Sequence, residues 1–156
     1  MIKPYFPARE GDPPPLRAEV QRKVRFQEVD SIGIVWHGRY AGYFEEARDA
    51  LGERYGIGYM DFFDNGILVP LKKLHTDFLR PLQLREEMTI EASLHYTAAA
   101  RINYAFVIRD HEGTVTTTGY SVQMMLDMDR KLCMFPPPFF EDFLNRWKRG
   151  EMTDSG

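Results

Sequence analysis

The chain has 156 residues, a length suited to one domain with a sizeable hydrophobic core. Its formal net charge of -3 gives no basic surface for a nucleic acid, and the sequence contains no run of about 18 apolar residues that could span a membrane. The single cysteine, Cys133, excludes an internal disulfide, and no secretory signal pattern follows Met1. We therefore expect a cytoplasmic protein.

Proline dominates the beginning of the chain. Residues 1–18 are expected to form an extended arm, because proline restricts both helix formation and pairing in a sheet. A single folded domain is expected over residues 19–149. Residues 150–156 lack apolar periodicity and are expected to form a flexible C-terminus.

A short strand over residues 20–27 is expected to lead into one long helix. From Gly38 onward, apolar residues recur at the spacing of a single helix face: Tyr40, Tyr43, Phe44, Ala47 and Leu51. Gly56 follows a basic last turn and marks the end of this helix. The pattern predicts an amphipathic helix of about four turns.

The second half of the chain changes to a period of two. Alternating apolar residues predict strands at about 67–78, 88–96, 102–109 and 114–126. Turn residues at 110–113 favour a hairpin between the last two. A short helix is expected after the prolines at 136–138. This order predicts an α+β fold, with an antiparallel sheet of about five strands wrapped around one long central helix.

The segment before the helix carries the most informative motif. It reads DSIGIVWHGRY from Asp30 to Tyr40, with Gly33, Val35 and His37 between them. This spacing resembles the active-site segment of the 4-hydroxybenzoyl-CoA thioesterase branch of the hotdog-fold acyl-CoA thioesterases. Two flanking positions depart from that family: Val29 replaces the usual Thr or Cys, and Lys23 the usual Gln or Arg.

The resemblance implies hydrolysis of an acyl-CoA thioester to a carboxylic acid and free CoA. Such chemistry needs a nucleophile or base near the carbonyl carbon and donors aimed at the carbonyl oxygen. Asp30 would supply the first, by direct attack or by activating a water. The backbone N–H groups of His37 and Gly38, at the helix start, would supply the second.

Other residues are candidates for binding the substrate. Gly33 would let the backbone turn closely beside the carboxylate, and Tyr40, Phe44 and Tyr59 would line an acyl pocket. Phosphates of CoA suit arginine, and Arg101 and Arg80 lie near the ends of expected strands. Glu45 and Arg48 are interpreted as a structural pair on the long helix.

The histidines and the lone cysteine show no metal-ligand spacing, so neither a metal nor a cofactor is expected. The resemblance implies a homodimer or homotetramer with sites at subunit interfaces, and the thioester could be carried by CoA or by acyl carrier protein. Two alternatives remain open at this point. One is a hotdog hydratase or dehydratase, and the other is a non-catalytic module that binds acyl-CoA.

Overall fold

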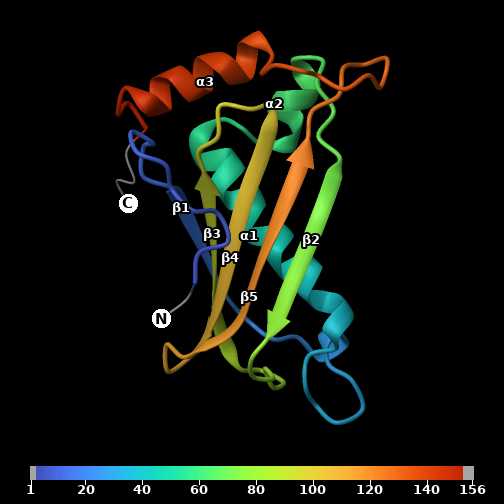
Figure 1. Ribbon diagram of the computed structural model, residues 1–156. Coiled ribbons are helices and arrows are strands. Elements are labelled where there is room, and N and C mark those ends of the chain that lie inside the picture. The colour runs from blue at the N-terminus through green and yellow to red at the C-terminus, as the bar shows by residue number, and fades with distance from the viewer. Residues whose placement is uncertain (1–2, 153–156) are drawn as a thin grey trace.

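The computed structural model describes residues 3–152 and contains one five-stranded antiparallel sheet (Figure 1). Along the sheet the strands follow the order β1-β3-β4-β5-β2. Their bounds are β1 Leu16–Lys23, β2 Leu71–Phe78, β3 Glu87–His95, β4 Arg101–Asp110 and β5 Val115–Met124. The strands β1 and β2 therefore form the two edges of the sheet.

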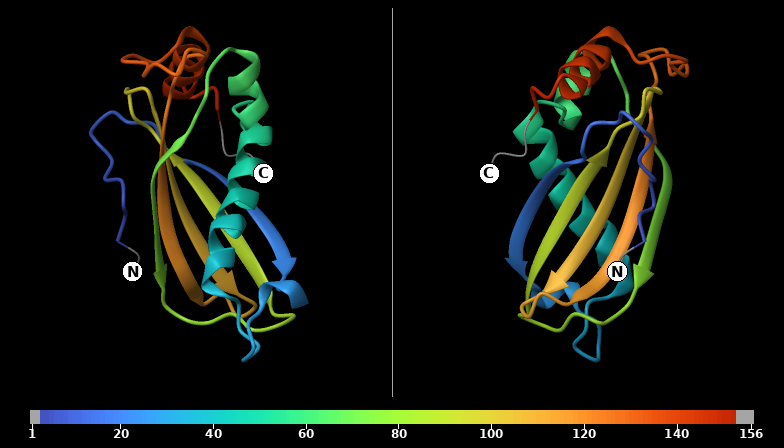
Figure 2. Two further views of the ribbon diagram at one scale, coloured as in Figure 1. Left: turned by 90° about the vertical axis from the view of Figure 1, so that its right-hand side faces the viewer. Right: turned by 60° about the vertical axis from the view of Figure 1, so that its left-hand side comes forward.

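The long helix α1, Tyr40–Tyr55, lies against one face of this sheet (Figure 2). It packs over β1 and β3 and buries its apolar stripe, including Tyr43, Phe44 and Leu51. A single 3-10 turn, η2 (His37–Arg39), leads directly into it. The predicted α+β architecture, with about five antiparallel strands and one long helix, is confirmed.

The first strand lies earlier in the chain than the expected range of 20–27. Leu16 and Ala18 are buried, and β1 pairs with β3 from Leu16 opposite Leu94 to Lys23 opposite Glu87. The last residues of the expected arm, 16–18, therefore belong to the sheet. After Val24 the chain leaves the sheet through a short 3-10 turn, η1 (Phe26–Glu28).

Two short helices lie at the end of the sheet where α1 ends (Figure 1). The helix α2, Tyr59–Asp64, was not expected from the sequence. Gly58 is its N-cap and donates its N–H to the Asp61 carboxylate at 2.8 Å, and the helix packs through the buried ring of Phe62. The helix α3, Pro138–Lys148, follows the prolines as predicted.

The described part of the N-terminal arm lies on the sheet face opposite α1 (Figure 2). Tyr5 reaches β2 and β5 through its hydroxyl, which lies 2.7 Å from both the Asp77 carboxylate and the Thr118 hydroxyl. The ring of Phe6 covers His95 at a centroid distance of 5.4 Å. Burial lowers the pKa of His95 to about 4, so its ring is neutral at physiological pH.

Gly119 on β5 allows the close approach of α1. A Cβ atom there would lie 2.6 Å from the Phe44 ring and 2.5 Å from the His75 carbonyl oxygen, and the latter cannot move easily. We predict that Gly119→Ala lowers the free energy of unfolding by about 1–3 kcal/mol through overpacking. Gly42→Ala is the matched control, because its Cβ would meet nothing within 4 Å. It should stabilise α1 by about 0.5–1 kcal/mol, and urea denaturation of both variants would measure the difference.

Candidate active site

Asp30 lies on a small hairpin that precedes α1. The N–H of Asp30 donates to the Ile34 carbonyl at 2.8 Å, and the N–H of Trp36 donates to the Glu28 carbonyl at 2.9 Å. Gly33 closes the turn with φ +81°, a conformation that glycine adopts without strain. The Asp30 carboxylate accepts the N–H of Ile32 at 3.0 Å, which fixes the side chain over the turn.

The start of the helix follows this hairpin at once. Within residues 3–152, the backbone N–H groups of His37 and Gly38 have no hydrogen-bond acceptor, as expected for the first turn of a helix. The indole of Trp36 covers Gly38 so closely that a Cβ there would lie 2.1 Å from the ring. The helix start therefore presents free donors and the positive end of the helix dipole.

Asp30 and His37 line the same cleft of about 380 Å³. Its walls come from the hairpin, the first residue of α1 and the chain that follows β2: Ile34, Val35, Tyr40, Phe78, Leu79, Arg80 and Pro81. Tyr40 is fixed in this wall by an edge-to-face contact with Phe78, at a centroid distance of 5.1 Å. A carboxylate beside the residue that opens the helix, in one largely apolar cleft, is an arrangement that could polarise a carbonyl group and attack it.

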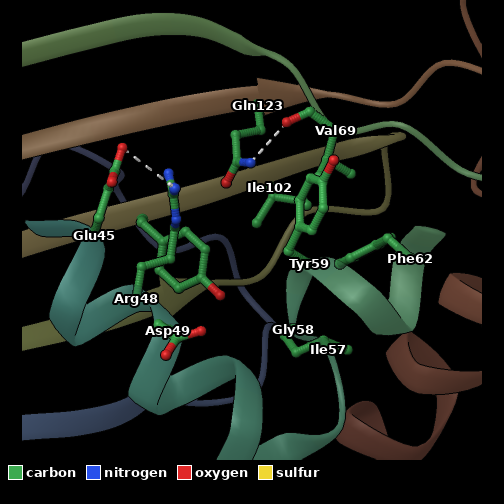
Figure 3. A pocket seen from close by; sticks show the side chains of 11 residues that line it. Glu45, Arg48, Asp49, Ile57, Gly58, Tyr59, Phe62, Val69, Ile102 and Gln123 are labelled. Atoms are coloured by element: carbon green, nitrogen blue, oxygen red, sulfur yellow. Dashed lines mark hydrogen bonds and ion pairs between the residues drawn. The ribbon is translucent and has the colours of Figure 1, made fainter. Parts of the chain in front are cut away.

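A second pocket, of about 260 Å³, lies beside the middle of α1 (Figure 3). Its polar groups include Arg48, which lies 4.0 Å from the Glu45 carboxylate, and Gln123, which donates to the Val69 carbonyl at 2.8 Å. Burial raises the pKa of the Tyr104 hydroxyl, so this group remains protonated. The remaining lining residues are Asp49, Ile57, Gly58, Tyr59, Phe62 and Ile102.

The structure therefore divides the residues that the sequence singled out. Asp30, His37, Tyr40 and Arg80 line the first cleft, whereas Tyr59 lines the second pocket. Within one chain these candidates therefore line two separate pockets.

Two further candidates have other positions. Phe44 is buried in the core, stacked on Phe106 at a centroid distance of 4.5 Å. Arg101 lies at the start of β4, on a hollow of the outer sheet face with Lys3 and Lys73.

A buried charged cluster beside the hairpin was not predicted from the sequence. The Glu28 carboxylate lies 2.6 Å from the Arg22 guanidinium and accepts a hydrogen bond from the Tyr43 hydroxyl at 3.1 Å. Burial disfavours the charged form of Glu28, but the Arg25 N–H and the Arg22 guanidinium outweigh it and hold its pKa below the ordinary value. The sequence offered two weak signals of such a cluster. Arg22 is a charged residue on the expected first strand, and Glu28 is an acidic residue two positions before the motif.

Residues 3–152 contain no group of three His, Cys, Asp or Glu side chains placed to hold a metal ion. Over the same range, none of the helices combines the length and the apolar character needed to cross a bilayer.

An antiparallel sheet with one long helix on its concave side is the hotdog fold, and solved hotdog thioesterases share it with this chain. The DHNA-CoA thioesterase of Staphylococcus aureus superposes with a TM-score of 0.76, at 23% identity, over 87% of this chain and 91% of that one. The family model of the Thioesterase-like superfamily matches residues 24–146. The chain therefore belongs to the thioesterase-like superfamily, and by class it is a thioester hydrolase.

Named relatives agree with this class. The chain is 30% identical to the chloroplastic acyl-acyl carrier protein thioesterase ATL3 of Arabidopsis thaliana over 107 residues, 67% of this chain. The match spans only 56% of the length of that relative. A putative acyl-CoA thioesterase of Bacillus subtilis, YneP, is 25% identical over 69% of this chain and 78% of its own length.

The lowered pKa of Glu28 predicts a pH-dependent contribution to stability. A carboxylate with a depressed folded-state pKa stabilises the protein fully above its ordinary pKa and loses this contribution as the pH falls through the folded value. At pH 7, Glu28→Gln should therefore cost about 3 kcal/mol, because it leaves Arg22 buried with one carboxylate fewer. The difference from wild type should shrink as the pH falls below the ordinary pKa of glutamate.

Denaturation in urea between pH 7 and pH 3 would measure this effect. Asp142→Asn is the control, because Asp142 forms an exposed pair with Arg146 at 2.9 Å. Its cost should stay below about 1 kcal/mol at every pH. A cost for Glu28→Gln that does not change with pH would contradict the assignment of a charged Glu28.

Proposed function

We propose that the protein hydrolyses an acyl-CoA thioester to a carboxylic acid and free CoA, with Asp30 as the nucleophile or general base. The observation that carries this proposal is the cleft that Asp30 shares with His37, the residue at the helix start whose N–H is unpaired among the described residues. Membership of the superfamily and the thioesterase names of its relatives support the reaction class.

The thioester carbonyl oxygen would accept the N–H of His37, with that of Gly38 as a second donor. Charge develops on this oxygen as the tetrahedral intermediate forms, so donors that are already in place lower the barrier. Asp30 either attacks the carbonyl carbon, forming a mixed anhydride that water then hydrolyses, or removes a proton from an attacking water. In both routes the CoA thiolate leaves and is protonated.

The cleft also indicates how a substrate would lie. Ile34, Val35 and Phe78 offer apolar walls near Asp30, which suits the acyl group or the pantetheine arm, and the guanidinium of Arg80 at the rim suits a phosphate. Arg101 does not line this cleft, but it lines the hollow of the outer sheet face that shares Leu79 with it. Acyl carrier protein is a second candidate carrier, as the name of the Arabidopsis relative indicates.

We further propose a homodimer that pairs the β2 edges of two copies. β2 is an edge strand with exposed apolar side chains, including Leu71 and Leu74, which is a poor surface to leave in water. Two copies of one strand related by a twofold axis pair antiparallel. The Phe78 end of one β2 would then lie beside the Leu71 end of the other.

This arrangement would unite the divided site. Leu71 pairs with Gln123 of β5, and Gln123 lines the second pocket together with Tyr59. The second pocket of one copy would therefore face the Asp30 cleft of the other. Figure 1 places the hairpin loop before α1 and the loop after β5 at opposite ends of the molecule, which a twofold axis across β2 would exchange. The partner subunit would thereby supply the far wall for the acyl group.

We also propose that the protein is located in the cytoplasm.

Asp30→Asn should lower kcat by about 100- to 10,000-fold, because the amide neither attacks nor removes a proton. Detection of free thiol with a panel of aliphatic and aromatic acyl-CoA substrates would measure the loss. Asp110→Asn is a matched control, because Asp110 likewise accepts the N–H two residues ahead, from Glu112 at 2.9 Å. Near-normal turnover by Asp30→Asn would remove the proposed mechanism. Hydration of an enoyl-CoA without thiol release would favour the hydratase reading.

Leu74→Arg tests the dimer. A charge in the middle of the exposed edge should shift the oligomer to the monomer in light scattering and should lower turnover together with it. Thr89→Arg on β3 places the same charge away from this edge and should leave the dimer intact. A Leu74→Arg variant that stays dimeric would exclude pairing through β2.

A further inference from the structure

A cluster of four side chains, three of them largely buried and Glu46 partly exposed, lies beside the Asp30 hairpin. We call it the Glu28 cluster: Arg22, Glu28, Tyr43 and Glu46. Arg22 bonds the Glu28 and Glu46 carboxylates, each at 2.6 Å, and Tyr43 donates to Glu28 at 3.1 Å. The guanidinium also lies 5.0 Å from the centre of the Tyr43 ring. Charge-assisted hydrogen bonds of this kind are strong when buried, and they hold their partners in one geometry.

The cluster connects three elements that are separate in the fold. Arg22 belongs to β1, Glu28 begins the hairpin, and Tyr43 and Glu46 belong to α1. Glu28 is thus tied to the helix twice, directly by Tyr43 and through Arg22 to Glu46. The hairpin is thereby held at a fixed position relative to the first two turns of α1.

Glu28 also reaches both halves of the cleft through the backbone. It lies two residues before Asp30, and its carbonyl accepts the N–H of Trp36 at 2.9 Å, one residue before His37. Any shift of Glu28 would therefore move the carboxylate and the amide donors relative to each other. The other side-chain link between the hairpin segment and the helix start is exposed, from Arg39 to the Gln27 carbonyl at 2.8 Å.

Further bonds hold the hairpin to a different part of the chain. Val35 donates to the Leu82 carbonyl at 2.8 Å, and Leu84 donates to the Gly33 carbonyl at 3.1 Å. These contacts fix the hairpin to the segment before β3, not to α1. Among the described residues, Glu28 is the buried polar side chain that joins the hairpin to the helix by a hydrogen bond, whereas Val35 of the hairpin is buried in the apolar core that includes Tyr43.

We propose that Glu28 is a positioning residue for the hydrolysis: the Glu28 cluster sets the separation between the Asp30 carboxylate and the helix-start amides. This inference rests on the function proposed above. Glu28 does not line the cleft and takes no part in bond making. Its effect is exerted through Asp30, so it should change kcat and leave substrate binding nearly unchanged.

The expected effect follows from the sensitivity of such sites to geometry, since a displacement of about 1 Å can cost on the order of 100-fold in rate. Glu28→Gln keeps the size of the side chain but loses the charge that Arg22 and Tyr43 bind. It should lower kcat by about 10- to 100-fold and change KM by less than about twofold. Tyr43→Phe removes one hydrogen bond, keeps the ion pair, and should lower kcat by a smaller factor.

A double-mutant cycle separates positioning from a general loss of stability. In the Asp30→Asn background, Glu28→Gln should have little further effect on the residual turnover, because the group that it positions is already disabled. An equal reduction in both backgrounds would overturn the proposal. Leu51→Ala, a truncation in the buried core of α1, is the control for destabilisation and should keep kcat per folded molecule.

The remaining outcomes distinguish this proposal from the proposed function. If Asp30→Asn is inactive while Glu28→Gln and Tyr43→Phe both keep wild-type kcat, the positioning role is wrong and the function stands. If Asp30→Asn keeps its turnover, the proposed mechanism fails, and the positioning role fails with it. If Glu28→Gln does not fold, Tyr43→Phe decides the question, because it leaves the Arg22 to Glu28 pair in place.

Discussion

The burial of one face of α1 against the sheet is the constraint on which the remaining structure depends. Tyr43, Phe44 and Leu51 are almost fully buried, and the ring of Phe44 lies between Phe106 and the bare backbone of Gly119. Such close packing leaves little freedom for the helix to slide or rotate. Because the helix is held along its length, its first turn can border an open cleft and still stay ordered.

The first turn of α1 has N–H groups that are unpaired among the described residues, and these favour a negative charge beside the start of the helix. Free amide groups and the helix dipole favour a negative charge nearby, and Asp30 is delivered to the cleft by a hairpin closed at Gly33. A hairpin is a flexible unit unless other groups fix it. The Glu28 cluster meets this need with buried hydrogen bonds, so apolar packing holds the helix and polar bonding would hold the hairpin.

The sequence predicted the parts of this arrangement that arise from local patterns. Apolar periodicity identified α1 and the later strands, and the spacing from Asp30 to Tyr40 identified one of the two chain segments that form the cleft. Contacts between distant segments could not be read in the same way. The bond between Glu28 and Tyr43 spans 15 residues: the apolar spacing of the helix predicts that Tyr43 is buried, but nothing in the local pattern around Glu28 indicates that its carboxylate is buried beside Tyr43.

The residues expected to line the acyl pocket also show that contacts between distant segments cannot be predicted from local patterns. Tyr40 and Tyr59 are both aromatic residues near the motif, yet the turn after α1 and the helix α2 carry Tyr59 to the far end of β2. The sequence alone cannot show that Tyr40 and Tyr59 lie far apart, because the distance between them depends on the path that the chain takes from α1 back to the sheet. A twofold axis across an exposed edge strand exchanges the ends of that strand. The division of the candidate residues between the two ends is therefore itself an argument for a site shared by two copies, since a monomer would leave each half without its counterpart.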